Sequence, residues 1–289
     1  MGISNLLLYA IPLFILAIFV EYQISKKRKK STYNKSDLMA NLGNGVGDIL
    51  LGGLATSYTG TFYYFIYHLC APWRMEYLGF SGLGFSIAIW IMAILADDFI
   101  YYWFHRTSHT IRLFWACHVV HHSSPNFNFS TAIRYGWMVI LYKPFYWFGM
   151  AAIGFHPLMI ITCAALNAMY QFFCHTDLLP FWDRLSSFLS TPGLHAIHHG
   201  KEHDCIDRNY AGIFIFYDRL FGTYQPIHAG QKISYGVTHP PRSDELMEIT
   251  FHEFRNLLGC MRSSKSWKIK IKYMFNRPGW QPDHSNFVQ

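Results

Sequence analysis

Histidine is concentrated in three short stretches of this 289-residue chain. The stretches are His105-x-x-x-His109, His118-x-x-His121-His122 and His195-x-x-His198-His199, and together they hold eight of the sixteen histidines. Neutral imidazole is a good ligand for iron, copper and zinc. Eight imidazoles exceed what one tetrahedral or octahedral ion can take, so the count predicts two metal ions held side by side.

Helical spacing would let the histidines of each stretch share one face, because residues three and four apart are neighbours on a helix. A continuous helix through His109 and His118 would place the second stretch on the opposite face, since nine residues advance by about two and a half turns. The first two stretches can therefore meet only if the chain bends, and we expect that bend near Thr110 to Leu113.

Polar residues in front of the first stretch extend the same helical face. Asp98, Tyr102, His105 and His109 advance by four, three and four residues. We expect the Asp98 carboxylate to lie behind the first ligands, where it could accept an imidazole N–H and fix the tautomer. A role in helix packing is the alternative.

His175 is a ninth candidate ligand. Asn167 and Gln171 precede it by eight and four residues, on the same helical face, so Gln171 is expected to support it. The alternative is an ordinary polar residue at a membrane helix end. His203 is left out, because Gly200 is expected to end the helix that carries the third stretch.

Composition favours a membrane protein. Hydrophobic residues make up 52% of the chain and charged residues 14%, against roughly 25% charged in soluble domains. Uncharged stretches cover Ile3–Val20, Ile49–Pro72 and Leu83–Ala96, and a further apolar stretch covers Tyr135–Cys174. A bilayer crossing needs about 20 apolar residues. The chain is therefore expected to cross the membrane several times.

The topology follows from the basic run Lys26–Lys30, which the positive-inside rule places in the cytoplasm. Three spans are expected, at Ile3–Val20, Ile49–Cys70 and Leu83–Phe104. Tyr135–Cys174 is expected to form a hairpin of two helices, with its turn at Gly154–Pro157. This arrangement brings all three histidine stretches and His175 to the cytoplasmic side of a multi-pass protein, in a bacterial inner membrane or the endoplasmic reticulum.

The predicted fold is thus all-α, with polytopic membrane helices and a cytosolic, largely helical, histidine-rich cap. We expect one domain over residues 1–289, with the membrane part at about 3–174 and the metal-binding cap at 105–134 and 175–289. The net charge of +7 indicates attraction to anionic headgroups, and no nucleic-acid partner is expected. Basic and aromatic residues alternate over Arg262–Arg277, which indicates either an interfacial element or a solvated basic tail.

The histidine count separates several kinds of metal site. A catalytic zinc takes three protein ligands, and the H-E-x-x-H pattern with its glutamate base is absent from the sequence. A transporter would hold its ligands near the middle of the membrane, whereas these lie at helix ends. A binuclear iron site that activates O₂ fits best. A non-redox, zinc-binding membrane hydrolase or scaffold is the alternative.

Several motifs around the histidines resemble the fatty acid hydroxylase and sterol desaturase superfamily of integral-membrane di-iron enzymes. They are Asp98–Arg106, His121-His122-Ser123-Ser124, Thr191–His195, Ile206–Tyr210 and Asp218–Thr223, and the resemblance covers Leu95–Thr223. Ser130–Arg134, Tyr235–Thr238 and Pro278–Trp280 are similar to its alkylglycerol monooxygenase-like branch. The chain departs from the superfamily at Tyr217, where tryptophan is frequent, and at His203 and Cys205.

The resemblance implies that the eight clustered histidines and His175 bind two iron ions. It places Asp207 and Asn209 beside the ligands, with turn formation as the alternative. It also implies O₂-dependent hydroxylation or desaturation of a C–H bond in a membrane lipid, sterol or ether lipid, with O₂ as co-substrate. No flavin, dinucleotide or haem motif occurs, so electrons are expected from a separate donor, either a redox protein or the pterin that the branch implies.

Overall fold

The computed structural model describes residues 4–30, 32–228 and 230–282, so Ile3, the expected start of the first span, lies outside the described residues. Within this part of the chain every regular element is helical, apart from two isolated β-bridges, Leu189 with Phe214 and Gly200 with Tyr235. The all-α prediction is confirmed.

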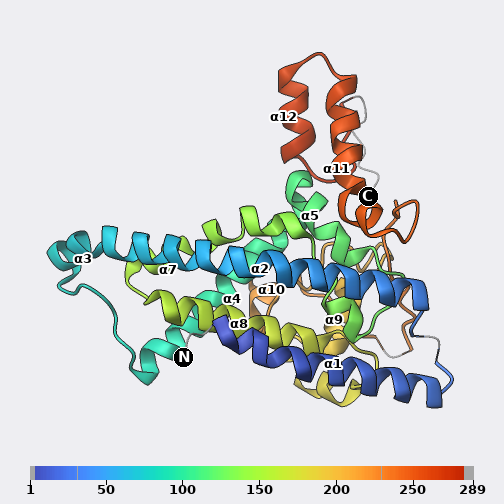
Figure 1. Ribbon diagram of the computed structural model, residues 1–289, viewed down its shortest axis with the longest axis horizontal. Helices are drawn as coiled ribbons and strands as arrows, with labels where there is room; N and C mark the ends of the chain where they lie inside the picture. The colour runs from blue at the N-terminus through green and yellow to red at the C-terminus, as the bar shows by residue number, and fades with distance from the viewer. Residues whose placement is uncertain (1–3, 31, 229, 283–289) are drawn as a thin grey trace.

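Long helices lie side by side along the longest axis of the molecule (Figure 1). They are α1 (Ser4–Lys27), α2 (Lys35–Leu69) and α8 (Pro157–Cys174). Helix α4 (Ile87–Thr110) runs obliquely to them, α3 (Ala71–Leu78) follows at the end of α2, and α7 (Pro144–Ile153) precedes α8. Gly154 ends α7 in the left-handed conformation, with φ of 111°, and His156 caps α8 directly afterwards. The expected hairpin is therefore present, with its turn at the expected place.

Two of the described helices are long and apolar enough to cross a membrane, namely α4 and α8. Against them packs an aromatic and aliphatic core that includes Phe104, Trp147, Met150, Met159 and Ile160. Phe104 comes from α4, Trp147 and Met150 come from α7, and Met159 and Ile160 come from the amino end of α8, so this core joins the three helices.

Helix α2 begins much earlier than the expected second span, at Lys35 rather than at Ile49. The Asn34 side chain starts it by accepting hydrogen bonds from the backbone N–H groups of Ser36 and Asp37. The additional turns carry Asp37, Asn41 and Asn44, all of them buried. They belong to the support of the histidine region and not to an apolar span.

The part of the chain outside the long helices contains shorter elements. These are α5 (Arg112–His122), α6 (Phe129–Ala132), η1 (Trp137–Leu141), η2 (Pro180–Leu185), α9 (Pro192–His198), α10 (Phe216–Leu220), α11 (Leu246–Ser263) and α12 (Trp267–Phe275). The expectation of a largely helical cap is wrong between Thr176 and Glu245, where long loops join three short helices. Part of this loop region is held by hydrogen bonds from its backbone N–H groups to buried aspartate side chains, as described below.

Candidate metal centre

Nine histidines form two adjacent groups at one end of the long helices. The first group is His105, His109, His118, His122 and His198, and the second is His121, His175, His195 and His199. Within each group the ligand atoms lie within 4.8 Å of one another, and all nine side chains are buried. The groups touch through the rings of His122 and His199, whose centroids are 4.3 Å apart.

The bend expected between the first two stretches is present. Helix α4 ends at Thr110, Ile111 adopts an extended conformation with φ of −114° and ψ of 116°, and α5 starts at Arg112. This single extended residue turns α5 back, so that His118 and His122 face His105 and His109. The centroids of the His105 and His118 rings are 4.9 Å apart.

The remaining ligand candidates come from two further helix ends. His175 directly follows α8, and its ring lies 4.3 Å from that of His195. His195 and His198 lie on α9 and His199 caps it, while the Thr191 side chain and Pro192 start this helix. Four helix ends therefore converge on one region.

Backbone carbonyls fix the tautomers of four of these histidines. The Nδ1–H of His105 donates to Tyr210 O at 2.8 Å, and that of His198 donates to Arg208 O at 2.7 Å. His121 donates in the same way to Arg134 O at 3.1 Å, and His175 to Gln171 O at 2.7 Å. A carbonyl oxygen only accepts, so each Nδ1 carries the proton and each Nε2 presents a lone pair.

These lone pairs point at one another. His121 Nε2 lies 3.0 Å from His175 Nε2, with no proton available between them. His118 Nε2 lies 3.1 Å from the Nε2 atoms of both His105 and His122. Buried acceptors facing each other at this distance repel unless a cation lies between them. The donor set therefore fits a metal ion.

The spacing of the nitrogens is also what a metal requires. For metal–nitrogen bonds of about 2.0–2.1 Å, two ligands at a right angle are about 2.9 Å apart and two tetrahedral ligands about 3.4 Å apart. The nitrogen–nitrogen distances of 3.0–3.1 Å are closer to the right-angled value. In addition, His109 Nε2, His198 Nε2 and His199 Nε2 are buried without a hydrogen-bond partner among the described residues.

Burial keeps the imidazoles neutral. It lowers the pKa of His121 to about 4 and that of His198 to about 3, because the charged ring would lose its hydration. Burial, with repulsion from neighbouring rings, also holds the pKa of His118, His195 and His199 well below the usual value. The site therefore offers deprotonated ligand nitrogens at neutral pH.

Asp98 has a different partner from the one expected. Within the described residues, its carboxylate accepts from the backbone N–H groups of Ile213 at 2.7 Å and Phe214 at 2.8 Å, not from an imidazole. Asp218 does the same for Tyr210 and Ala211, both at 2.8 Å. The two aspartates hold the loop whose Tyr210 carbonyl accepts a hydrogen bond from the Nδ1–H of His105. Asp98 thus acts on the ligand through the backbone.

The other expected supporting residues lie close to the histidines. The backbone carbonyl of Gln171 accepts a hydrogen bond from the Nδ1–H of His175, while its side-chain amide donates to Gly212 O. Asp207 Oδ1 lies 3.9 Å from His109 Nδ1. Asn209 has φ of +53°, and its amide donates to Leu194 O and Gln225 O, both at 3.0 Å. Asn209 therefore joins α9 to the loop and does not contact a ligand ring.

A buried ion pair beside His121 was not anticipated. Arg134 Nη1 donates to Asp37 Oδ1 at 2.8 Å, and both side chains are almost completely buried. The same guanidinium donates to Ser123 Oγ at 2.7 Å and to Val120 O at 2.9 Å. Arg134 is also the residue whose carbonyl accepts from His121. Local sequence gives no indication of this pair, because its members are 97 residues apart.

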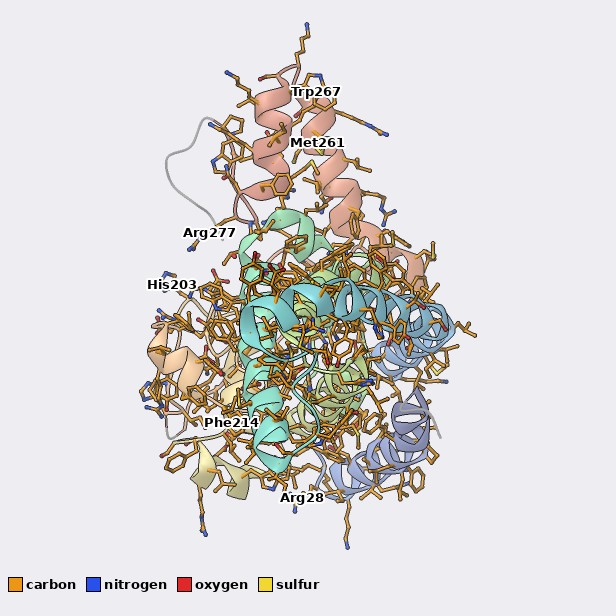
Figure 2. All side chains as sticks on the ribbon, turned by 90° about the vertical axis from the view of Figure 1, so that its left-hand side faces the viewer. Arg28, His203, Phe214, Met261, Trp267 and Arg277 are labelled. Atoms are coloured by element: carbon orange, nitrogen blue, oxygen red, sulfur yellow. The ribbon has the colours of Figure 1, made fainter. Side chains whose placement is uncertain are left out.

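His203 lies outside the two groups, as expected, and so do the cysteines. The His203 side chain is fully exposed and lies 3.4 Å from Asp204 (Figure 2). All six cysteines are free, and four of them are buried.

The sequence of the chain is similar to proteins of a known family. Residues 90–223 match the family model described as fatty acid hydroxylase. Alkylglycerol monooxygenase of Homo sapiens is 35% identical over 193 residues, that of Danio rerio 36% over 193 and that of Xenopus tropicalis 36% over 200. Each match covers 67% of this chain and 43% of the relative, so the chain spans less than half the length of these relatives.

No solved structure matches the chain. The matched region, residues 90–223, contains all nine histidines and the loop with Asp207 and Asn209. Together with the similarity to the alkylglycerol monooxygenases, it assigns the protein: the chain belongs to the fatty acid hydroxylase family, in the branch that contains the alkylglycerol monooxygenases.

Proposed function

We propose that the protein is an O₂-dependent di-iron oxygenase of a membrane that hydroxylates a C–H bond of a lipid. The observation that carries this proposal is the convergence of nine buried imidazoles into two adjacent groups, in which four backbone carbonyls fix Nε2 lone pairs that face other ligand candidates. Two irons bound there would supply the reduction of O₂ and the attack on the C–H bond.

The size of the first group favours iron over zinc. Its five imidazoles exceed the four ligands of a tetrahedral zinc site, whereas iron accepts more than four. We assign His105, His109, His118, His122 and His198 to one ion and His121, His175, His195 and His199 to the other. The four backbone carbonyls keep the ligand nitrogens free of protons, and the surrounding burial excludes water from them.

The reaction needs two electrons and two protons for each O₂, since one oxygen atom enters the substrate and the other leaves as water. The chain has no flavin, dinucleotide or haem motif, so a separate donor supplies the electrons. The relatives are named alkylglycerol monooxygenases, which favours an ether lipid as substrate and hydroxylation over desaturation. A diffusible pterin or a redox protein serves as the donor.

The helices and the basic run after α1 support a membrane orientation. We propose that α1, α2 from about Ile49 onward, and α4 cross the bilayer, that α7 and α8 form an in-and-out pair, and that residues 1–289 form one domain. The basic run after α1 then lies in the cytoplasm, on the same side as the histidines.

Metal analysis after anaerobic purification tests the proposal. About two irons per chain, with O₂ consumption that depends on added reductant, are expected from the two groups. One tightly bound zinc per chain and no O₂ consumption would instead establish the non-redox alternative.

The substrate class is tested by comparing the lipids of cells with and without the gene. The expected difference is a lipid species heavier by one oxygen atom, or its aldehyde breakdown product if the hydroxylated carbon carries the ether oxygen. The His199→Ala variant is the matched control, and it should give the lipid profile of cells that lack the gene.

A further inference from the structure

Helices α11 and α12 form a hairpin that projects from the body of the protein, and we call residues 246–277 the arm. Figure 1 shows the arm standing crosswise to the long helices α2 and α8. Figure 2 shows Trp267 near its tip, Met261 beside it and Arg277 at its base. No part of the proposed metal centre lies in the arm.

One face of α12 is apolar and exposed. Trp267, Ile271 and Phe275 follow one another at four-residue spacing, which places them in one stripe along the helix. Their exposed fractions are 73%, 53% and 53%. The opposite face is packed, because Tyr273 is buried against Trp280, with ring centroids 5.4 Å apart. A contiguous exposed apolar stripe indicates a contact surface.

Basic residues border this stripe. Lys268 and Lys272 are exposed on α12, and Arg262 and Lys265 are exposed where the two helices join. Lys270 Nζ lies 4.9 Å from the centre of the Trp267 ring, in a cation–π contact. An apolar stripe with aromatic ends and flanking lysines is the pattern of helices that lie in the headgroup region of an anionic membrane.

The contacts at the base of the arm determine its position along the membrane normal. Arg112, the first residue of α5, pairs with Glu253 of α11 at 2.9 Å, and its backbone N–H donates to Asn276 O at 3.0 Å. Arg112 follows the end of α4 by two residues. Since α4 is a candidate membrane-crossing helix, the arm leaves the body at the level where the bilayer ends. Its crosswise direction then runs along the membrane surface (Figure 1).

We propose that the arm is a docking surface for the anionic headgroup layer of the same membrane. Trp267, Ile271 and Phe275 enter the boundary between headgroups and acyl chains, and Lys268 and Lys272 pair with lipid phosphates. The proposal rests on the membrane orientation given under the proposed function. It does not depend on the metal or on the reaction.

Photo-crosslinking of the full-length chain in lipid vesicles tests the arm. A benzophenone amino acid is placed at Ile271 in one variant and, as a reference, at Ile91 on the exposed side of α4 in another. The vesicles contain either phosphatidylcholine alone or a mixture with phosphatidylglycerol. We expect lipid adducts at both positions, with the yield at Ile271 higher in the anionic mixture and lower at high salt.

The outcomes separate the arm from the membrane orientation. Lipid adducts at Ile91 without adducts at Ile271 would refute the proposal that the arm docks on the membrane, and they would leave the proposed membrane orientation intact. Cross-links from Ile271 to a second copy of the chain would also overturn the docking proposal, because the stripe would then be a protein interface. If neither position reacts with lipid, the orientation fails and the arm proposal fails with it.

Charge variants test the partner's chemistry. Lys268→Gln combined with Lys272→Gln is expected to weaken partitioning of the arm roughly thirtyfold at low salt, since each lysine near an anionic surface contributes about 1 kcal/mol, which is about a fivefold factor. Lys201→Gln combined with Lys232→Gln removes two exposed lysines outside the arm and is the matched control. Equal adduct yields at Ile271 from the two double variants would contradict the anionic partner.

Discussion

The Asp37→Asn substitution probes how the amino-terminal part of α2 supports the metal centre. The Asp37 carboxylate accepts from the Arg134 guanidinium at 2.8 Å and from the Ser124 hydroxyl, also at 2.8 Å. The Asn41 and Asn126 amides donate to it as well, each at 3.2 Å. An asparagine keeps the shape of the side chain and removes its charge. Arg134 would then be left as a buried cation without its hydrogen-bonded counter-ion.

The expected loss of stability follows from that unpaired charge. Breaking a buried ion pair by removing one partner costs about 3–5 kcal/mol. This loss corresponds to a decrease of roughly 150- to 5,000-fold in the folding equilibrium constant. The Arg134 segment also holds the carbonyl that accepts from His121. Loss of such a support lowers metal affinity by roughly 10- to 100-fold, and here the four-histidine group is the one affected.

Two measurements on the purified, detergent-solubilised protein test this reasoning. The first is the midpoint of thermal or denaturant unfolding, and the second is the iron content after dialysis against a weak chelator. We expect a clear shift of the midpoint and a fall from about two irons to about one. Glu248→Gln is the matched control, since its partner Arg255 is more than half exposed and such pairs contribute at most about 1 kcal/mol.

A result against the reasoning is easy to recognise. If Asp37→Asn unfolds at the midpoint of the Glu248→Gln control and keeps both irons, the buried pair does not support the centre. If it unfolds earlier and loses both irons in step, the effect is global, and the assignment of His121 to a separate ion is unsupported.

Three further predictions concern packing, ligands and pH. Gly136→Ala should fail to form the metal centre, because its Cβ would lie 1.9 Å from a backbone carbonyl oxygen of α5. In the control Gly149→Ala the added Cβ meets nothing within 4 Å, so this variant should bind iron normally. The iron content of the two purified variants tests this prediction. His199→Ala should lose at least one iron, while His203→Ala at the exposed surface should lose none, and equal metal content in the two would refute the ligand assignment. Finally, burial lowers the pKa of His121 to about 4, below its value of about 6.5 in the unfolded chain, so the unfolded state takes up protons first. Metal-free protein should therefore be most stable above about pH 6.5 and lose stability as the pH falls; a melting temperature constant from about pH 8 to 5 would contradict this.

Local spacing was sufficient to predict the positions of the ligand candidates. Intervals of three and four residues determine which side chains share a helical face, so the grouping within each stretch could be inferred without a structure. The bend at Ile111 could be predicted too, because a straight helix would have separated His109 from His118. His175 was found by the same argument, from its position at the end of an apolar stretch.

Partners distant in the chain could not be predicted in this way. Asp98 lies on the expected helical face, yet it binds backbone amides of residues 213 and 214, which only the folded loop brings to it. The early start of α2 was missed because its first turns are polar and resemble a linker. Arg134 looked like an ordinary basic residue after the second stretch, since its counter-ion lies on that missed segment.

Main-chain oxygens, and not side chains, accept the hydrogen bonds from the Nδ1–H groups of four histidines. The course of the backbone therefore determines which ring nitrogen of each of these histidines is protonated. Replacing the phenol of Tyr210 or the guanidinium of Arg208 leaves those oxygens where they are, provided the loop keeps its course. Side chains around the candidate metal centre can therefore be exchanged without changing which nitrogen of these four histidines faces the metal.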